Sequence, residues 1–313
     1  MKKNIYFLGF LLLAACANDD EPTGQQVQNT YPLTIEVTEN PLIPDGEEGS
    51  STRAAITDNS SFATFYLNYQ YNTTNSGYDD KQTITKTSGT WSGGSWPNSA
   101  VDLNYEVNWF AYTDGIFYFT DGTPHRAYIT CASDEFSSGQ KDLLVATASG
   151  TYIGTNNGNL SFTFNHACAA LRFQVKKSSN LGEHSLTVSS IVLKNVVKHG
   201  KYYYDTGDWT LINTDTSKDI TNYTLFSGSM TPGSSYTFLN GSENDSYLFL
   251  IPQELKGDVS SGTYVEIAWQ SNYGGSHASG TARIPLSKVL EKGYKYDVKI
   301  NIGKTTLTTH SGY

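Results

Sequence analysis

Two positions near the N-terminus have residue types suited to covalent processing. An apolar run from Ile5 to Leu13 leads into Ala14-Ala15-Cys16, the pattern of a bacterial lipobox. The run is too short to cross a bilayer as a helix, so residues 1–15 are interpreted as a lipoprotein signal peptide. We expect signal peptidase II to cleave before Cys16 and lipid to be attached to its thiol. The alternative is an ordinary signal peptide that contains a cysteine by chance.

The second position is Arg53, which is the only lysine or arginine between Lys3 and Lys81. It lies in a linker rich in Gly, Ser and Thr and is followed by Ala54. An isolated arginine in an exposed linker is a good target for a protease. The sequence therefore indicates that a protease could cut at Arg53 and separate the residues before it from the rest of the chain.

The residues before this arginine predict a β-strand that the cleavage would release. Tyr31, Leu33, Ile35 and Val37 alternate with polar residues. Side chains on a strand alternate between its two faces, so this pattern is typical of a half-buried strand. Pro and Gly residues after it end the strand. We interpret residues 16–53 as a disordered tether followed by one removable strand.

Other residues whose types could support catalysis or metal binding are better explained by structural roles. His166 lies beside Phe164, and no second His or Cys stands at ligand spacing, so a core histidine is favoured over a metal ligand or catalytic group. Asp205 and Asp208 flank Gly207, which favours a surface turn over a weak calcium site. Motifs for a serine nucleophile, a zinc protease or a phosphate-binding loop are missing from the sequence. The sequence predicts no enzyme, no cofactor and no metal site.

The tryptophans and the two remaining cysteines leave alternatives open. Each tryptophan could stack on a sugar or fill a core, and the core is favoured for most. Export through the periplasm would permit a disulfide between Cys131 and Cys168. Cys168 stands in a run of alanines, which favours a small buried residue instead. The five tryptophans are Trp91, Trp96, Trp109, Trp209 and Trp269.

Composition narrows the class of protein. The chain has 313 residues, which is enough for two domains of ordinary size. Aromatic residues make up 13% and there are 28 glycines, a profile typical of strands joined by many turns. The net charge is −9 and the basic residues are scattered, so the sequence has no basic patch of the kind that nucleic-acid binding requires.

The strand candidates divide into two groups. Turn signals recur about every 8–12 residues, as expected of an all-β sandwich. A Gly- and Asn-rich stretch at residues 150–159 separates the groups, so we predict domains at 54–157 and 158–303. Residues 304–313 remain as a short C-terminal tail.

An ordered set of short segments resembles the fimbrillin family, the type V pilus subunits of Bacteroidales. Each segment alone is a weak signal, but together they span nearly the whole mature chain in the order of the family. The segments are Trp96-Pro97, Asn108-Trp109-Phe110-Ala111-Tyr112, Lys141-Asp142-Leu143-Leu144-Val145-Ala146, Phe164-Asn165-His166-Ala167-Cys168-Ala169-Ala170-Leu171-Arg172-Phe173, Leu250-Ile251-Pro252-Gln253 and Gly293-Tyr294-Lys295-Tyr296.

The resemblance implies a fold and an assembly mechanism. The expected fold is all-β, with two transthyretin-like β-sandwich domains in tandem. The life cycle that the resemblance implies is export as a lipoprotein, anchoring in the outer membrane through lipid, and cleavage between Arg53 and Ala54 by an arginine-specific protease. Loss of the first strand would open a groove that a strand from another fimbrial subunit fills. An acidic run after Cys16, Asp19-Asp20-Glu21, resembles the signal that sends lipoproteins of Bacteroidota to the cell surface.

Two functions follow from these observations. The favoured one is a structural subunit of a cell-surface fimbria, assembled by donor-strand exchange. The alternative is a monomeric, lipid-anchored adhesin that keeps its first strand and binds a host ligand or a glycan. The tail at 304–313 shows little apolar alternation, so the sequence leaves open whether this subunit also donates a strand.

Overall fold

The computed structural model of the chain consists almost entirely of β-strands. It describes residues 31–40, 43–44, 56–57, 62–71, 81–120, 125–132, 142–212, 220–239 and 247–303. These residues form 25 strands, one short α-helix, α1 (Asn98–Asp102), and one 3-10 turn (Ser179–Leu181). The prediction of an all-β chain is confirmed. In this part of the chain, no helix has the length and apolar content needed to cross a membrane.

The largest sheet has eight strands and contains the predicted first strand. Every neighbouring pair is antiparallel except β2 and β13, which run parallel. In spatial order the strands are β4 (Ile56–Thr57), β2 (Thr34–Glu39), β13 (Asn159–His166), β12 (Leu144–Gly150), β9 (Val107–Tyr112), β5 (Thr64–Tyr71), β6 (Gln82–Thr87) and β7 (Thr90–Ser92).

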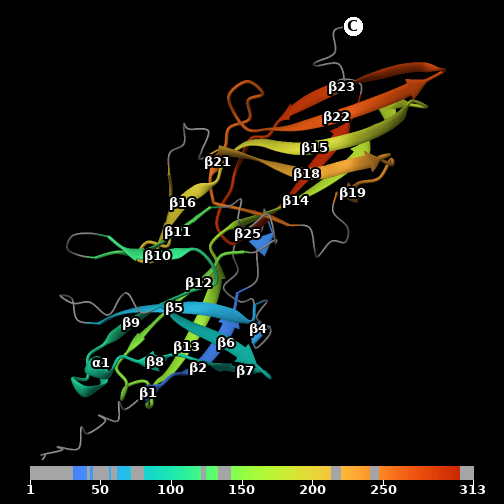
Figure 1. The fold of residues 1–313 in the computed structure, drawn as a ribbon. Helices are drawn as coiled ribbons and strands as arrows, with labels where there is room; N and C mark the ends of the chain where they lie inside the picture. Colours follow the sequence, from blue (N-terminus) through green and yellow to red (C-terminus); the bar gives the residue numbers. More distant parts are fainter. Residues whose placement is uncertain are drawn as a thin grey trace, which may run out of the picture.

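This sheet closes on itself around the first hydrophobic core. β1 (Tyr31–Pro32), which leads into β2, pairs with β8 (Ser95–Trp96), which follows β7. Because β2 and β7 stand near opposite ends of the strand order, this pairing brings the two ends of the sheet together. Phe65 of β5 and Phe164 of β13 are three strands apart in that order, yet their ring centroids are 5.1 Å apart. Flat neighbouring strands are about 4.8 Å apart, so this contact requires a strongly curved sheet. The strands lie together in the lower part of Figure 1.

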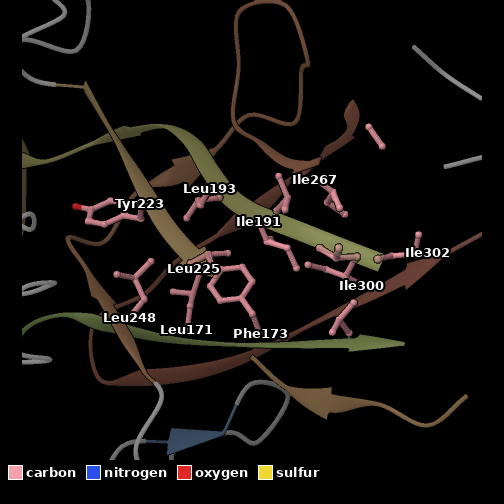
Figure 2. Packing of buried hydrophobic residues seen from close by; sticks show 14 of the residues in the cluster. Leu171, Phe173, Ile191, Leu193, Tyr223, Leu225, Leu248, Ile267, Ile300 and Ile302 are labelled. Carbon is pink, nitrogen blue, oxygen red and sulfur yellow. The ribbon is translucent and has the colours of Figure 1, made fainter. Parts of the chain in front are cut away.

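A second hydrophobic core lies between two further sheets. One has the order β18-β15-β22-β23, and the other has the order β19-β14-β25-β3, with β20 also paired to β14. Figure 2 shows apolar side chains of the two sheets, such as Phe173 and Ile191, pointing toward one another. The bounds are β18 (Ile220–Met230), β15 (Ser185–Val197), β22 (Tyr264–Tyr273), β23 (Ser276–Pro285), β19 (Thr237–Phe238), β14 (Ala169–Lys177), β25 (Tyr294–Ile302), β3 (Ile43–Pro44) and β20 (Leu248–Leu250).

A four-stranded sheet joins segments from the two halves of the sequence. Its order is β10 (Ile116–Phe119), β11 (Ala127–Ala132), β16 (His199–Tyr203) and β17 (Trp209–Leu211). Its inner side chains pack with Tyr112 and Leu143 into a third, smaller cluster. The remaining sheet pairs β21 (Glu254–Leu255) with β24 (Lys288–Val289).

The chain passes from the first core to the second core after His166. The predicted domain boundary falls after residue 157, but Leu160, Phe162 and Phe164 of β13 all pack in the first core. The Gly- and Asn-rich stretch at 151–158 is a turn that leads from β12 into β13, within a single sheet. Turn residues mark a change of direction and do not show whether the next strand joins a new core.

Candidate strand-exchange site

The first strand occupies a position in the sheet that is supported mainly from one side. All six residues of β2 pair in parallel with Asn159–Phe164 of β13. On its other edge, β4 pairs only with Thr38 and Glu39. Within the described residues, the remainder of that edge has no strand partner. β2 is therefore bonded along its whole length to one neighbour and at one end to another.

The apolar face of the first strand is part of the first core. Leu33, Ile35 and Val37 are 7%, 8% and 7% exposed, whereas the intervening Thr34 and Glu36 are exposed. The predicted alternation of this strand is thereby confirmed. Tyr31 is half-buried, and its ring packs edge-on against Tyr152 at 5.2 Å. Burying three such side chains contributes roughly 5–9 kcal/mol by area, as an upper bound.

A buried polar cluster holds the end of the first strand. Nε2 of His166 lies 3.7 Å from Oε1 of Glu39, the last residue of β2, and Nδ1 of His166 hydrogen-bonds to the Asp142 carboxylate. Burial disfavours the imidazolium, but the hydrogen bond to Asp142 and the charges of both carboxylates raise the pKa of His166 above its ordinary value. The expectation of a hydrogen-bonded core histidine is confirmed.

Sequence reasoning did not single out Glu39, although the alternation of the strand already indicated that its side chain is buried. It stands in phase with Leu33, Ile35 and Val37, so strict alternation places it on the buried face. A buried carboxylate requires a partner, and His166 is the residue that meets it. The strand therefore carries a polar contact at its end in addition to its apolar side chains.

The outer face of β2 is tied to β13 by side chains as well as by the backbone. Oγ1 of Thr38 donates to Oγ1 of Thr163 at 3.0 Å, and Nδ2 of Asn40 donates to Oδ1 of Asn165 at 2.7 Å. The backbone N–H of Asn40 also donates to the carbonyl of Phe164, which extends the ladder past the strand end. These contacts are exposed, so each contributes little alone.

The segment after β2 reaches the second core and then returns. β3, at residues 43–44, pairs in parallel with the start of β25, and β4, at residues 56–57, pairs with the end of β2. The predicted processing residues Cys16, Arg53 and Ala54 lie outside the described residues. In the sequence, Arg53 separates β3 from β4, so cleavage there would detach β1, β2 and β3 from the rest of the chain.

The other residues noted in the sequence have structural roles. Trp91, Trp96, Trp109 and Trp269 are buried, and the half-buried Trp209 donates from Nε1 to the carbonyl of Ala167 at 2.6 Å. The expectation that most tryptophans fill cores is confirmed. Cys131 and Cys168 are both buried, and no disulfide joins them in the structure. Burial raises the pKa of the Cys168 thiol well above its usual range. Asp205 and Asp208 lie in the turn between β16 and β17, as expected.

Comparison with known proteins identifies the family. A family model described as fimbrillin-like matches residues 51–312, which is most of the chain. The chain belongs to the fimbrillin-like family. The match begins beyond β1, β2 and β3 of this fimbrillin-like chain and just before Arg53. Membership supports a fimbrial or adhesive role at the cell surface.

A solved structure shares the fold of this fimbrillin-like protein at low sequence identity. A fimbrial protein from Bacteroides vulgatus is 17% identical, with a TM-score of 0.51, over 87% of this chain and 95% of that chain. A candidate cell adhesion protein from Bacteroides ovatus is 12% identical, with a TM-score of 0.48, over 89% of this chain and 95% of its own. No curated protein matches the chain significantly.

Proposed function

We propose that this chain is a structural subunit of a cell-surface fimbria that assembles by exchange of its first strand. Arg53 is cleaved, β1 to β3 leave, and a strand from another fimbrial subunit takes the place of β2. The observation that carries the proposal is the pairing of β2, a strand bonded mainly to β13 and joined to the later chain only through the Arg53 linker.

Removal of β2 would create a site that favours a new strand. The edge of β13 would present unpaired N–H and C=O groups, which act as a template for another strand. The places of Leu33, Ile35 and Val37 would become an apolar slot in the first core. An extended donor segment fills such a site by β-augmentation, with the backbone giving affinity and alternate side chains giving specificity.

The lipid at Cys16 complements this mechanism. Signal peptidase II and lipidation would deliver the subunit to the outer membrane, facing the outside of the cell. Two or more acyl chains on the N-terminal cysteine form a stable anchor. Cleavage at Arg53 would release the lipid together with β1–β3, so a single cut would both free the subunit and open its groove.

A substitution at the cleavage position tests the proposal. In cells producing Arg53→Ala, surface protein should begin at Cys16 and remain monomeric, because the variant has no lysine or arginine between Lys3 and Lys81. The matched control, Arg126→Ala, removes an arginine outside the linker and should still start at Ala54 and enter high-mass polymers. N-terminal sequencing and gel analysis of surface extracts report both results. Normal assembly of Arg53→Ala would show that cleavage does not gate polymer formation.

A peptide competition tests the acceptor groove separately. A synthetic peptide with the sequence of residues 31–39 should slow polymer growth of cleaved subunits, because it refills the slot. A control peptide with Asp at positions 33, 35 and 37 lacks the apolar face and should have no effect. Equal effects of the two peptides would contradict an apolar acceptor groove.

A further inference from the structure

A cavity of about 640 Å³ lies between the outer face of the eight-stranded sheet and the four-stranded sheet. This volume falls within the range of small-molecule sites, about 300–1,000 Å³. Its lining comes from β5, β9 and β12 on one side and from the ends of β11 and β16 on the other. None of β1, β2 or β3 contributes to its lining, so the cavity is separate from the strand-exchange site.

The floor of the cavity is a row of polar side chains set by strand register. Gln70 of β5 pairs with Asn108 of β9, which pairs on its other side with Ser149 of β12. Thr147 stands two pairs further along, opposite Phe110, and so points to the same face. Among the described residues, these amides and hydroxyls form no side-chain hydrogen bond to one another. They present several donors and acceptors to a ligand.

Aromatic rings form the wall beside this floor. The ring centroids of Phe110 and Tyr204 are 5.1 Å apart in an edge-to-face contact. The hydroxyl of Tyr204 donates to the carbonyl of Ala111 at 2.8 Å, which fixes the ring between the two sheets. The cavity therefore offers rigid apolar surface next to its polar row.

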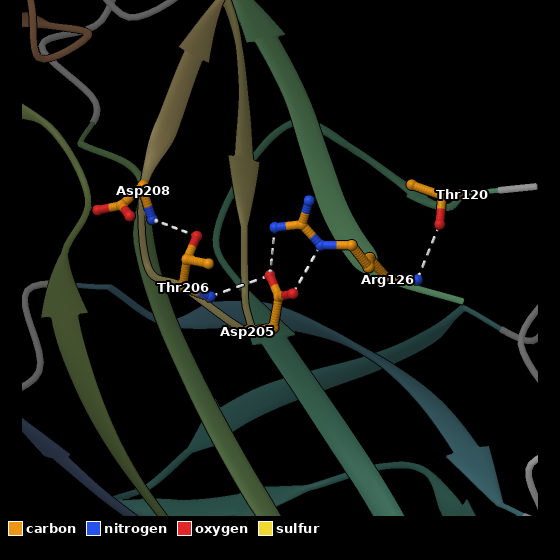
Figure 3. Close-up of polar contacts among 5 residues, drawn as sticks. All are labelled: Thr120, Arg126, Asp205, Thr206 and Asp208. Atoms are coloured by element: carbon orange, nitrogen blue, oxygen red, sulfur yellow. Dashed lines mark hydrogen bonds and ion pairs between the residues drawn. The ribbon is translucent and has the colours of Figure 1, made fainter. Parts of the chain in front are cut away.

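The rim of the cavity carries charges that cancel. Nε and an Nη of Arg126 donate to the two carboxylate oxygens of Asp205 at 2.6 and 2.9 Å, and Figure 3 shows this paired geometry. The backbone N–H of Arg126 donates to Oγ1 of Thr120. Nδ1 of His125 donates to the carbonyl of Thr120, which leaves its Nε2 as an acceptor in the neutral ring. The lining thus has one positive and one negative side chain, already paired.

A row of tyrosines continues from the rim across the four-stranded sheet. The Arg126 guanidinium lies 4.2 Å from the ring centroid of Tyr203. The rings of Tyr203 and Tyr128 are 5.5 Å apart, and those of Tyr128 and Tyr118 are also 5.5 Å apart. Tyr118 at the far end is 43% exposed. Tyr203 alternates with Tyr202 and Tyr204, which face the other sheet, so the row lies on the outer face of the four-stranded sheet. It meets the cavity at Arg126, which lines the cavity and packs on Tyr203.

We propose that the cavity and the tyrosine row bind a neutral oligosaccharide. One sugar unit occupies the cavity, where amides and hydroxyls match its hydroxyl groups. The next units pass Arg126 and lie along the tyrosines on the outer face of the four-stranded sheet. Sugar rings have apolar C–H faces that pack on aromatic rings, and tyrosine combines such a face with a polar tip. An anionic ligand would need an unpaired cation, but Arg126 is already neutralised by Asp205.

Equilibrium binding to defined oligosaccharides tests this proposal. The uncleaved chain is titrated by calorimetry with hexasaccharides of glucose, galactose and mannose, and with oligogalacturonate as the anionic probe. We expect saturable binding of at least one neutral probe. The measurement needs no cleavage at Arg53 and no polymer, so it can fail or succeed independently of strand exchange.

Two variants and two matched controls locate the site. Asn108→Ala removes an amide from the floor and Tyr128→Ala removes a ring from the row, and each should weaken binding about tenfold. Asn272→Ala and Tyr273→Ala remove the same residue types from the exposed end of β22 and should leave affinity unchanged. Thermal unfolding confirms that all four variants are folded.

Three results would overturn the proposal. The first is the absence of neutral-saccharide binding at concentrations up to about 10 mM. The second is binding that Asn108→Ala and Tyr128→Ala leave at the wild-type affinity. The third is tighter binding of oligogalacturonate than of every neutral probe, which would show that an anion is the preferred ligand.

Discussion

At the scale of the residue, His166 links the first strand to the rest of the protein. It bridges Glu39 of β2 and Asp142, which precedes β12, and all three side chains are about 10% exposed or less. Because its folded pKa is raised, the folded protein binds the proton more tightly than the unfolded chain does. This contribution to stability is fully present below the unfolded pKa of about 6.5 and is lost as the pH rises through the folded pKa.

The His166→Gln variant should therefore change the pH profile of stability. Gln keeps a donor for Asp142 but cannot titrate. Between pH 6 and pH 9, the free energy of unfolding of the wild type should fall relative to that of the variant. Urea unfolding at a series of pH values measures the difference. His277→Gln, at an exposed position on β23, is the control and should follow the wild type. Parallel profiles for wild type and His166→Gln would contradict the coupling.

At the scale of the element, β2 depends on three side chains that face the first core. Ile35→Ala removes a side chain that is 8% exposed and should lower the free energy of unfolding by about 2–5 kcal/mol. Ile116→Ala makes the same change at a 60% exposed position of β10 and should alter it by no more than about 0.5 kcal/mol. Chemical denaturation compares the two. Similar effects at both positions would mean that β2 contributes little to the core.

At the scale of the whole molecule, the first segment pairs with strands of two different sheets, one around each core. β2 pairs with β13 in the first core, and β3 pairs with β25 in the second core. A chain that starts at Ala54 should lose hydrogen-exchange protection at Asn159–Phe164 and at Tyr294 and Lys295. A chain that starts at Tyr31 is the control and should stay protected.

Adding the missing segment separately distinguishes an open groove from general unfolding. A peptide covering residues 31–44 should restore protection at both places, because it supplies β1, β2 and β3. Strands far from the segment, such as β22, should show equal exchange in all samples. Loss of protection throughout the chain would indicate that the protein unfolds without its first strand and contains no preformed acceptor.

The sequence by itself determined features that depend on local period and residue type. Alternation at Leu33, Ile35 and Val37 predicted a half-buried strand because side chains in any strand alternate with a period of two. The apolar and small residues next to His166 and Cys168 in the sequence predicted that both side chains are buried. The all-β class came from recurring turn signals and from composition, and the family resemblance came from short segments in order.

Only the tertiary structure decided which distant segments meet. The contacts Thr38 to Thr163 and Arg172 to Asp297 each join residues 125 positions apart, and no local pattern specifies such a pairing. The partners of His166, the return of β3 to β25, and the cavity between two sheets all depend on this long-range register. The alternation within a strand predicts which of its faces is buried, but which strand pairs with it depends on how the whole sheet closes.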